Sequence, residues 1–292
     1  MKEVVGITGG MGEGKQKEEG GQRMRILQEK HLAGTPIRYW IGGNPEAETI
    51  VFLHSAFSDH HCFDEQVDAL ADDYQVIVPD LIGHGKSTDG KASDGIDKTA
   101  YFLHCILSEL SIARVHLAGV SIGSLFAQDF ANRYPGMVLS LCCVGGYDIN
   151  NFDPKMQREN SAGQARLILR AVFSVKWFAE GNRRVSAFTP EGQEKYYQMN
   201  LGFKRRSLRF FAGLNKIINK QETLPRDYPL MIACGAEDVP LAVKASLLWH
   251  EKEPNSRLVI FEQAGHHANL DVPEQFNATF KEFLEGTSKR AD

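Results

Sequence analysis

The stretch of this chain best suited to chemistry is a serine between two glycines, the sequence GVSIG at residues 119–123. An apolar run with β-branched residues leads into it from Val115, and a helical pattern leaves it. Gly-x-Ser-x-Gly at a strand-to-helix turn is typical of a nucleophile elbow, which holds a serine hydroxyl above the sheet in strained backbone geometry. We therefore predict that Ser121 is a nucleophile. The N–H of Ile122, at the start of the helix, is expected to stabilise negative charge on a substrate.

Two residues that could activate a serine follow the ends of other predicted strands. Asp238 comes shortly after an apolar run at 229–234, and His266 comes shortly after one at 258–261. Sites on parallel sheets lie beyond the carboxyl ends of the strands, so Ser121, Asp238 and His266 are expected to meet there. A hydroxyl attacks poorly without a base. We predict that His266 is this base and that Asp238 holds its imidazole and stabilises the cation.

Neighbouring residues leave alternatives for two of these roles. His267 competes with His266 as the base, and Glu237 or Asp148 competes with Asp238 as the acid. The spacing from the first histidine to the Asp-x-Pro sequence at 271–273 favours His266.

Predicted strands and helices alternate along most of the chain, which indicates a mostly parallel sheet with helices on both faces. The predicted strands are 24–32, 37–41, 49–53, 74–78, 115–120, 138–144, 229–234 and 258–261. The rhythm changes at 147–227, where only helical patterns occur, at 163–178, 190–201 and 206–218. We interpret 24–146 and 228–288 as the core and 147–227 as a helical cap, or lid, over the site.

The cap carries more aromatic residues than a small bundle needs for its own core, so some of them are free to line a pocket. Trp177 and Phe178 are the candidates taken from it as substrate contacts. Phe57, in the loop after a predicted strand, and His267, beside the predicted base, complete the set. Packing within the cap or onto the core is the competing interpretation for each aromatic residue.

Composition narrows the class of protein. The 292 residues are 42% hydrophobic with a formal net charge of −4, which fits a folded α/β protein and shows no basic patch for nucleic acid. No apolar run is long enough to span a membrane, and no secretory signal core is present. The five cysteines have no metal-site spacing and lie mostly in apolar runs, so we expect buried free thiols, no bound metal and a cytoplasmic location.

The first 23 residues differ from the rest. Residues 9–15 match the Gly-x-x-x-x-Gly-Lys pattern of a phosphate loop, which would suit a nucleotide-dependent transferase. The next residue is Gln16, which offers no hydroxyl to Mg²⁺, and glycines and charges follow where a helix should begin. We interpret 1–23 as a flexible leader.

Five motifs occur together between about Met24 and Leu284: HSAF at 54–57, DLIGHGKS at 80–87, GVSIG at 119–123, GAED at 235–238 and GH at 265–266. In this order they resemble the α/β-hydrolase superfamily, in its lidded serine esterase and lactonase branch. The resemblance implies an α/β-hydrolase fold whose oxyanion hole is formed by the backbone N–H groups of Ala56 and Ile122. The family usually has glycine where this chain has Ser55.

The resemblance also implies a function: a serine hydrolase that cleaves an ester, thioester, lactone or carbon–carbon bond next to a carbonyl through an acyl-serine intermediate. The expected partner is a small-molecule substrate, with no metal or organic cofactor, no nucleic acid and no membrane. The alternative is a ligand-sensing signalling module of the same fold, which keeps the three residues but turns over slowly or once.

Overall fold

The computed structural model of the chain describes residues 27–91, 94–151, 155–156, 169–218 and 226–288. The predicted leader at 1–23, with its phosphate-loop pattern, lies outside the described residues, and so does part of the predicted cap.

Eight strands form one sheet in the order β1-β2-β4-β3-β5-β6-β7-β8. They are β1 (Gln28–His31), β2 (Arg38–Gly43), β3 (Thr49–Leu53), β4 (Gln75–Pro79), β5 (Val115–Val120), β6 (Val138–Val144), β7 (Leu230–Gly235) and β8 (Arg257–Phe261). The pairs that β2 makes with β1 and β4 are antiparallel, and every other pair is parallel. The predicted fold class, a mostly parallel eight-stranded sheet, is confirmed.

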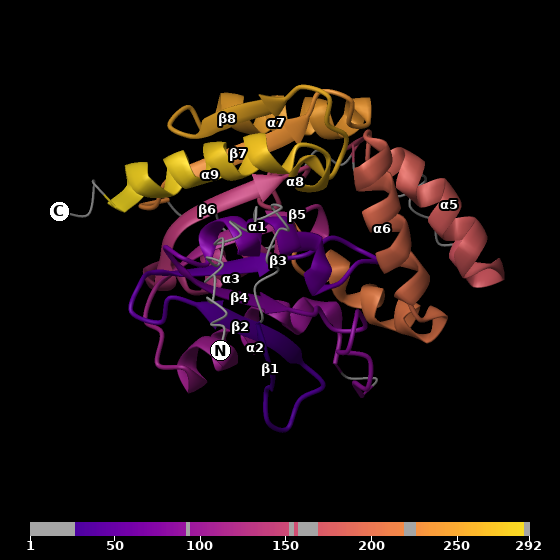
Figure 1. Cartoon of the computed structure of the whole chain (residues 1–292), viewed down its shortest axis with the longest axis horizontal. Helices are drawn as coiled ribbons and strands as arrows, with labels where there is room; N and C mark the ends of the chain where they lie inside the picture. The colour runs from indigo at the N-terminus through magenta and orange to yellow at the C-terminus, as the bar shows by residue number, and fades with distance from the viewer. Residues whose placement is uncertain (1–26, 92–93, 152–154, 157–168, 219–225, 289–292) are drawn as a thin grey trace, which may run out of the picture.

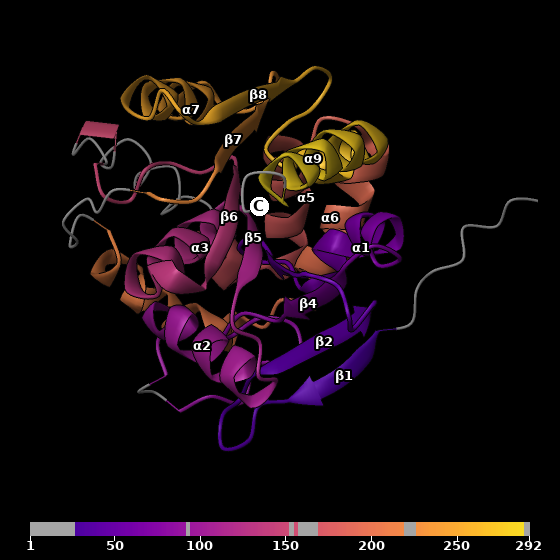
Figure 2. The same ribbon diagram turned by 90° about the vertical axis from the view of Figure 1, so that its left-hand side faces the viewer.

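Helices cover both faces of this sheet. The core helices are η1 (His60–Phe63), α1 (Asp64–Leu70), η2 (Ile96–Lys98), α2 (Thr99–Glu109), α3 (Ile122–Arg133), η3 (Pro135–Met137), α7 (Pro240–Lys252), α8 (Ala268–Asp271) and α9 (Pro273–Ser288). Figure 2 shows α2, α3 and α7 on one side of the sheet and α1 and α9 on the other. Two apolar clusters match these two layers.

The alternation of side chains along β3 shows how the layers form. All five residues of β3 are buried. Val51 and Leu53 contact the cluster under α2 and α3, whereas Ile50 and Phe52 contact the cluster under α1 and α9. Successive strand side chains point to opposite faces, so a strand covered on both faces carries apolar residues in succession, as at 50–53.

Two glycines let α3 pack closely on the strands that precede it. A Cβ at Gly119 would overlap the backbone of Gly123, and a Cβ at Gly123 would overlap the carbonyl of Leu53. The Gly-x-Ser-x-Gly pattern is therefore needed for the close approach of strand and helix at Ser121.

Among the described residues between β6 and β7, 169–173 are helical and three further elements follow: α5 (Val175–Ser186), α6 (Pro190–Gly202) and η4 (Arg205–Lys216), which we call the cap. Figure 1 shows the arrow of β6 pointing toward α8, with α5 and α6 beyond it. A helical insertion was predicted here, but the predicted helix at 163–178 is wrong at Ser174. There a new helix begins, because the Ser174 hydroxyl accepts from the N–H of Trp177 at 3.3 Å. The helix predicted at 206–218 is a 3₁₀ run.

Candidate active site

Ser121 lies at the turn between β5 and α3 in strained backbone geometry, with φ 56° and ψ −120°. Non-glycine residues rarely adopt a positive φ, and such strain is typical of functional positions. The N–H of Ser121 donates to the carbonyl of Val144 at 2.8 Å, and its carbonyl accepts from the N–H of Ser124 at 3.0 Å. The predicted strain at Ser121 is confirmed, and hydrogen bonds on both sides hold the residue in it.

Asp238 and His266 lie in contact at the ends of β7 and β8. Nδ1 of His266 is 2.9 Å from Oδ2 and 3.1 Å from Oδ1 of Asp238. The Asp238 side chain is fully buried, whereas that of His266 is 20% exposed. Burial lowers the pKa of His266, but the charge and hydrogen bond of Asp238 outweigh burial and raise this pKa above its ordinary value. Nδ1 therefore carries the proton, and Nε2 is left to accept one.

The end of β6 brings Ser121 and His266 into one neighbourhood. Val144, the last residue of β6, accepts the hydrogen bond from Ser121, and Gly145 follows it with φ 59°. A Cβ at Gly145 would lie 2.8 Å from Nδ1 and 2.9 Å from Cε1 of His266. Val144 thus binds the backbone of Ser121, and the next residue, Gly145, lies against the imidazole of His266.

The alternative acids do not have this contact. Oδ1 of Asp148 accepts from the N–H of Asn150 at 2.9 Å, and its Oδ2 accepts from the side-chain amide of Asn151 at 2.9 Å. The guanidinium of Arg226 lies 3.9 Å from Asp148. Glu237 is exposed. Asp238 is the carboxylate that the structure joins to His266.

His267, predicted as a substrate contact and as the alternative base, is fully buried between the core and the cap. Its Nδ1 lies 2.9 Å from the carbonyl of Ser186, and its Nε2 lies 2.7 Å from the hydroxyl of Ser55. Burial and the neighbouring His266 lower the pKa of His267 to about 3. Both ring nitrogens are engaged by protein groups, so His267 has the surroundings of a structural residue and His266 those of the base.

The backbone N–H groups of Ala56 and Ile122 have no acceptor among the described residues, and Ile122 is the first residue of α3. Nearby, Nε2 of His54 accepts from the N–H of Leu81 at 2.9 Å, which joins the loop after β3 to the loop after β4. The two N–H groups predicted for the oxyanion hole are thus free to donate to a ligand.

Asp80 fixes the second of these loops. Its Oδ1 accepts from the N–H and Nδ1 of His60 at 2.9 and 3.0 Å, and its Oδ2 accepts from the N–H of Lys86 at 2.7 Å. Burial raises the pKa of Asp80, but the hydrogen bond and charge of His60 outweigh it, so the pKa lies below its ordinary value. The carboxylate is a structural anchor.

The cap meets the core through four phenylalanines, which we call the aromatic cluster. The ring of Phe57, whose φ is 63°, lies 4.6 Å from Phe178, 4.9 Å from Phe203 and 5.3 Å from Phe211. The predicted contacts Phe57 and Phe178 therefore come together. Trp177 points elsewhere, being 54% exposed and lying beneath the guanidinium of Arg170.

His84 borders the aromatic cluster and was not predicted as a site residue. Its Nδ1 lies 3.1 Å from the carbonyl of Ile82, and its buried Nε2 has no partner among the described residues. Burial and the nearby His54 lower the pKa of His84 to about 3. The ring is neutral and presents an unused acceptor beside Phe203 and Phe211. Sequence alone shows only a histidine between glycines.

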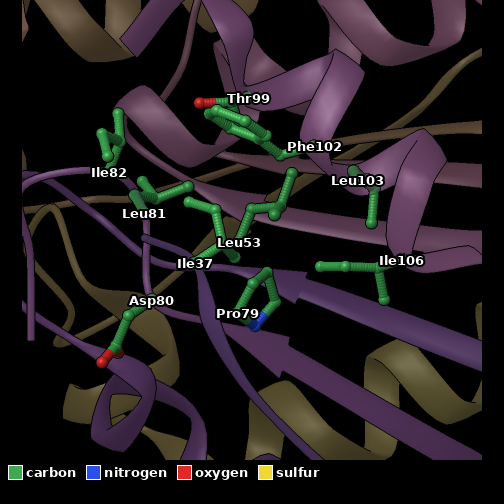
Figure 3. A pocket seen from close by; sticks show the side chains of 10 residues that line it. All are labelled: Ile37, Leu53, Pro79, Asp80, Leu81, Ile82, Thr99, Phe102, Leu103 and Ile106. Carbon is green, nitrogen blue, oxygen red and sulfur yellow. The ribbon is translucent and has the colours of Figure 1, made fainter. Parts of the chain in front are cut away.

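Two other features of the described residues have the outward form of a ligand site. Asp59, His60 and His61 offer atoms within 4.8 Å of one another, but Nδ1 of each histidine already contacts a carboxylate, on Asp80 and Asp64. A cavity of about 10 Å³ lies among apolar side chains including Leu53, Leu81 and Ile106 (Figure 3). It has room for about one water molecule, so it is a packing gap in the core.

No helix in the described parts of the chain combines the length and the apolar character needed to cross a bilayer.

Known proteins resemble this chain over most of its length. An uncharacterised protein of Mycobacterium bovis is 27% identical over 280 residues, which cover 89% of this chain and 82% of that protein. The (E)-2-((N-methylformamido)methylene)succinate hydrolase of Acinetobacter baylyi is 22% identical over 250 residues, covering 83% and 92%. A thermophilic esterase from Thermogutta terrifontis superposes with a TM-score of 0.76 at 21% identity, covering 90% and 99%.

The sequence pattern of one family spans most of the chain. Residues 48–273 match the family described as alpha/beta hydrolase fold, and this range contains Ser121, Asp238 and His266. The resemblance to the α/β-hydrolase superfamily stated from the motifs is confirmed. The chain belongs to the alpha/beta hydrolase fold family.

Proposed function

We propose that this protein is a serine hydrolase that transfers an acyl group to Ser121 and then to water. The observation that carries the proposal is the Asp238–His266 pair, whose imidazole lies against Gly145 at the strand end that also binds the backbone of Ser121. The strained turn at Ser121 supports it, and so do the backbone N–H groups of Ala56 and Ile122, which have no acceptor among the described residues.

The proposed reaction begins when Oγ of Ser121 attacks the substrate carbonyl and its proton passes to Nε2 of His266. Asp238 holds Nδ1–H and stabilises the imidazolium. The N–H groups of Ala56 and Ile122 donate to the oxyanion of the tetrahedral intermediate. His266 then returns the proton to the leaving group, which departs and leaves the acyl-serine. Water, activated by the same imidazole, releases the acid and restores Ser121.

The aromatic cluster gives a guide to the acyl group. Phe57 directly follows the proposed oxyanion residue Ala56 and packs on Phe178 of the cap. A substrate carbonyl held at Ala56 would place its neighbouring carbons near these rings. We infer that apolar or aromatic acyl groups, in an ester, thioester or lactone or next to a cleavable carbon–carbon bond, are preferred.

Turnover of p-nitrophenyl esters of increasing acyl length, followed over many equivalents of product, tests this function. We expect multiple turnovers by the parent protein and a loss of at least about 10³-fold in Ser121→Ala, because no other group supplies the nucleophile. Ser108→Ala, on the exposed side of α2, is the matched control and should keep the parent rate. An unchanged rate in Ser121→Ala would contradict the proposal, and a single slow turnover would favour the ligand-sensing module.

A further inference from the structure

The peptide group that carries the Ala56 N–H is fixed through its carbonyl. Because Nε2 of His54 accepts from Leu81, its Nδ1 carries the proton and donates to the carbonyl of Ser55 at 2.8 Å. The hydroxyl of Ser58 donates to the same carbonyl at 2.9 Å. In a planar trans peptide C=O and N–H point in opposite directions. These two donors therefore also set the direction of the Ala56 N–H.

The peptide group on the other side of Ala56 is held by the cap. Its carbonyl accepts a hydrogen bond of 2.8 Å from the hydroxyl of Tyr196, which lies on α6. Tyr196 is 3% exposed, and its oxygen accepts in turn from the side-chain amide of Asn182 on α5 at 3.2 Å. Two cap helices thus reach the proposed oxyanion residue through one phenol.

A second connection to the cap runs through the Ser55 side chain. The carbonyl of Ser186, at the end of α5, can only accept, so Nδ1 of His267 carries the proton and donates to it. Nε2 of the neutral His267 then accepts, and the hydroxyl of Ser55 donates to it at 2.7 Å. Donor and acceptor are therefore fixed in both hydrogen bonds: Ser55 donates to His267, and His267 donates to Ser186 in the cap.

We propose that the docked cap keeps the oxyanion N–H of Ala56 in the direction that the two donors on the Ser55 carbonyl give it, with Tyr196, Ser55 and His267 as positioning residues. This inference rests on the proposed function and deepens it by giving the cap a second task besides binding the acyl group. Glycine or alanine at this position would have no hydroxyl, so the connection through His267 depends on the side chain of Ser55. Small errors in the direction of an oxyanion donor weaken transition-state binding more than substrate binding.

The test compares Tyr196→Phe and Ser55→Ala with Tyr197→Phe, a matched control one residue along α6 whose ring lies beneath Arg183. For the best ester of the parent protein, kcat should fall about 10- to 100-fold in the first two variants with KM within about 2-fold. A trifluoromethyl ketone, whose adduct on Ser121 carries an oxyanion, should lose affinity by the same factor. Tyr197→Phe should match the parent in both measurements.

Replacement of His267 adds a rescue measurement. Glutamine has an oxygen that can accept from Ser55, and leucine does not. His267→Gln should therefore retain a higher kcat than His267→Leu, at equal melting temperature or after correction for the folded fraction.

Two results would overturn the inference: kcat and ketone affinity equal to the parent values in Tyr196→Phe and Ser55→Ala, or losses that only follow the loss of folded protein. Failure of the proposed function looks different. In that case the parent protein itself gives neither ester turnover nor a ketone adduct on Ser121.

Discussion

Gly145 presents no side chain to the imidazole of His266, and a Cβ there would lie 2.8 Å from Nδ1. That distance is shorter than ordinary van der Waals contact. Nδ1 cannot easily move away from an added Cβ, because Asp238 holds the ring through a hydrogen bond to this same atom. The position of the imidazole in the site therefore depends on the absence of one methyl group at the end of β6.

Gly145→Ala should reduce kcat/KM by at least about 100-fold, because the methyl group displaces the imidazole from Ser121 and Asp238. Gly34→Ala is the matched control: Gly34 also has a positive φ, of 71°, but nothing lies within 4 Å of an added Cβ. Both variants should lose about 1 kcal/mol of unfolding free energy to backbone strain. Steady-state kinetics and urea unfolding separate the two effects. Equal activity in both variants would contradict the placement of His266.

The pH dependence of kcat/KM should report the Asp238–His266 pair. His266 acts as a base only when neutral, so activity should rise with pH through a pKa above the ordinary histidine value, since Asp238 raises it. Asp238→Asn removes the charge, so the rising limb should move to lower pH while the plateau falls about 10³- to 10⁴-fold. A limb that stays in place in Asp238→Asn would show that another group raises the pKa.

Asp271 should be the residue whose loss most weakens the attachment of the cap. Its carboxylate accepts from the N–H groups of Phe188 and Thr189 in the cap and of Gly265, next to His266. Asp271→Asn turns an amide group toward these three donors and should cost about 2–4 kcal/mol of unfolding free energy.

Asp89→Asn is the control for Asp271→Asn, because Asp89 and Arg206 form an exposed ion pair. Asp89→Asn should change the free energy of unfolding by no more than about 0.5 kcal/mol. The urea midpoints of the two variants check the comparison, and similar midpoints would mean that Asp271 does not hold the cap.

Acid should destabilise the protein through its buried neutral histidines. His84 and His267 have pKa values lowered to about 3, so below about pH 6.5 the unfolded chain binds protons that the native protein does not. Stability should fall between about pH 6.5 and 3 by up to about 1.4 kcal/mol per pH unit for each histidine. His84→Phe should make this fall shallower. The same replacement at the exposed His31 should not, and equal slopes of urea midpoint against pH would refute the assignment.

The sequence predicted the parts of the structure that have local patterns. Continuous apolar runs marked strands such as β3, and the helical pattern at 190–201 marked α6, where the Thr189 hydroxyl caps the helix by accepting from the N–H of Gly192. The strain at Ser121 followed from the spacing of its glycines. Ser174 was missed because a serine that caps a new helix has the same local appearance as one within a helix.

What the sequence did not predict depends on partners far apart in the chain. Ser55 and His267 are separated by 212 positions, and nothing near either of them indicates their hydrogen bond. His267 was expected at the substrate because it adjoins His266, but adjacent side chains in a loop point in different directions. The unused acceptor of His84 likewise arises only from tertiary packing.

In the proposed mechanism Ser121 is a nucleophile activated by His266. The most direct measurement is the mass of the intact protein after reaction with a fluorophosphonate, followed by peptide mapping. The serine oxygen would displace fluoride from phosphorus and give up its proton to His266. We predict one adduct, on the peptide that contains Ser121, formed at least about 100-fold more slowly in His266→Gln. An adduct on another residue, or equal labelling of Ser121→Ala, would contradict the account.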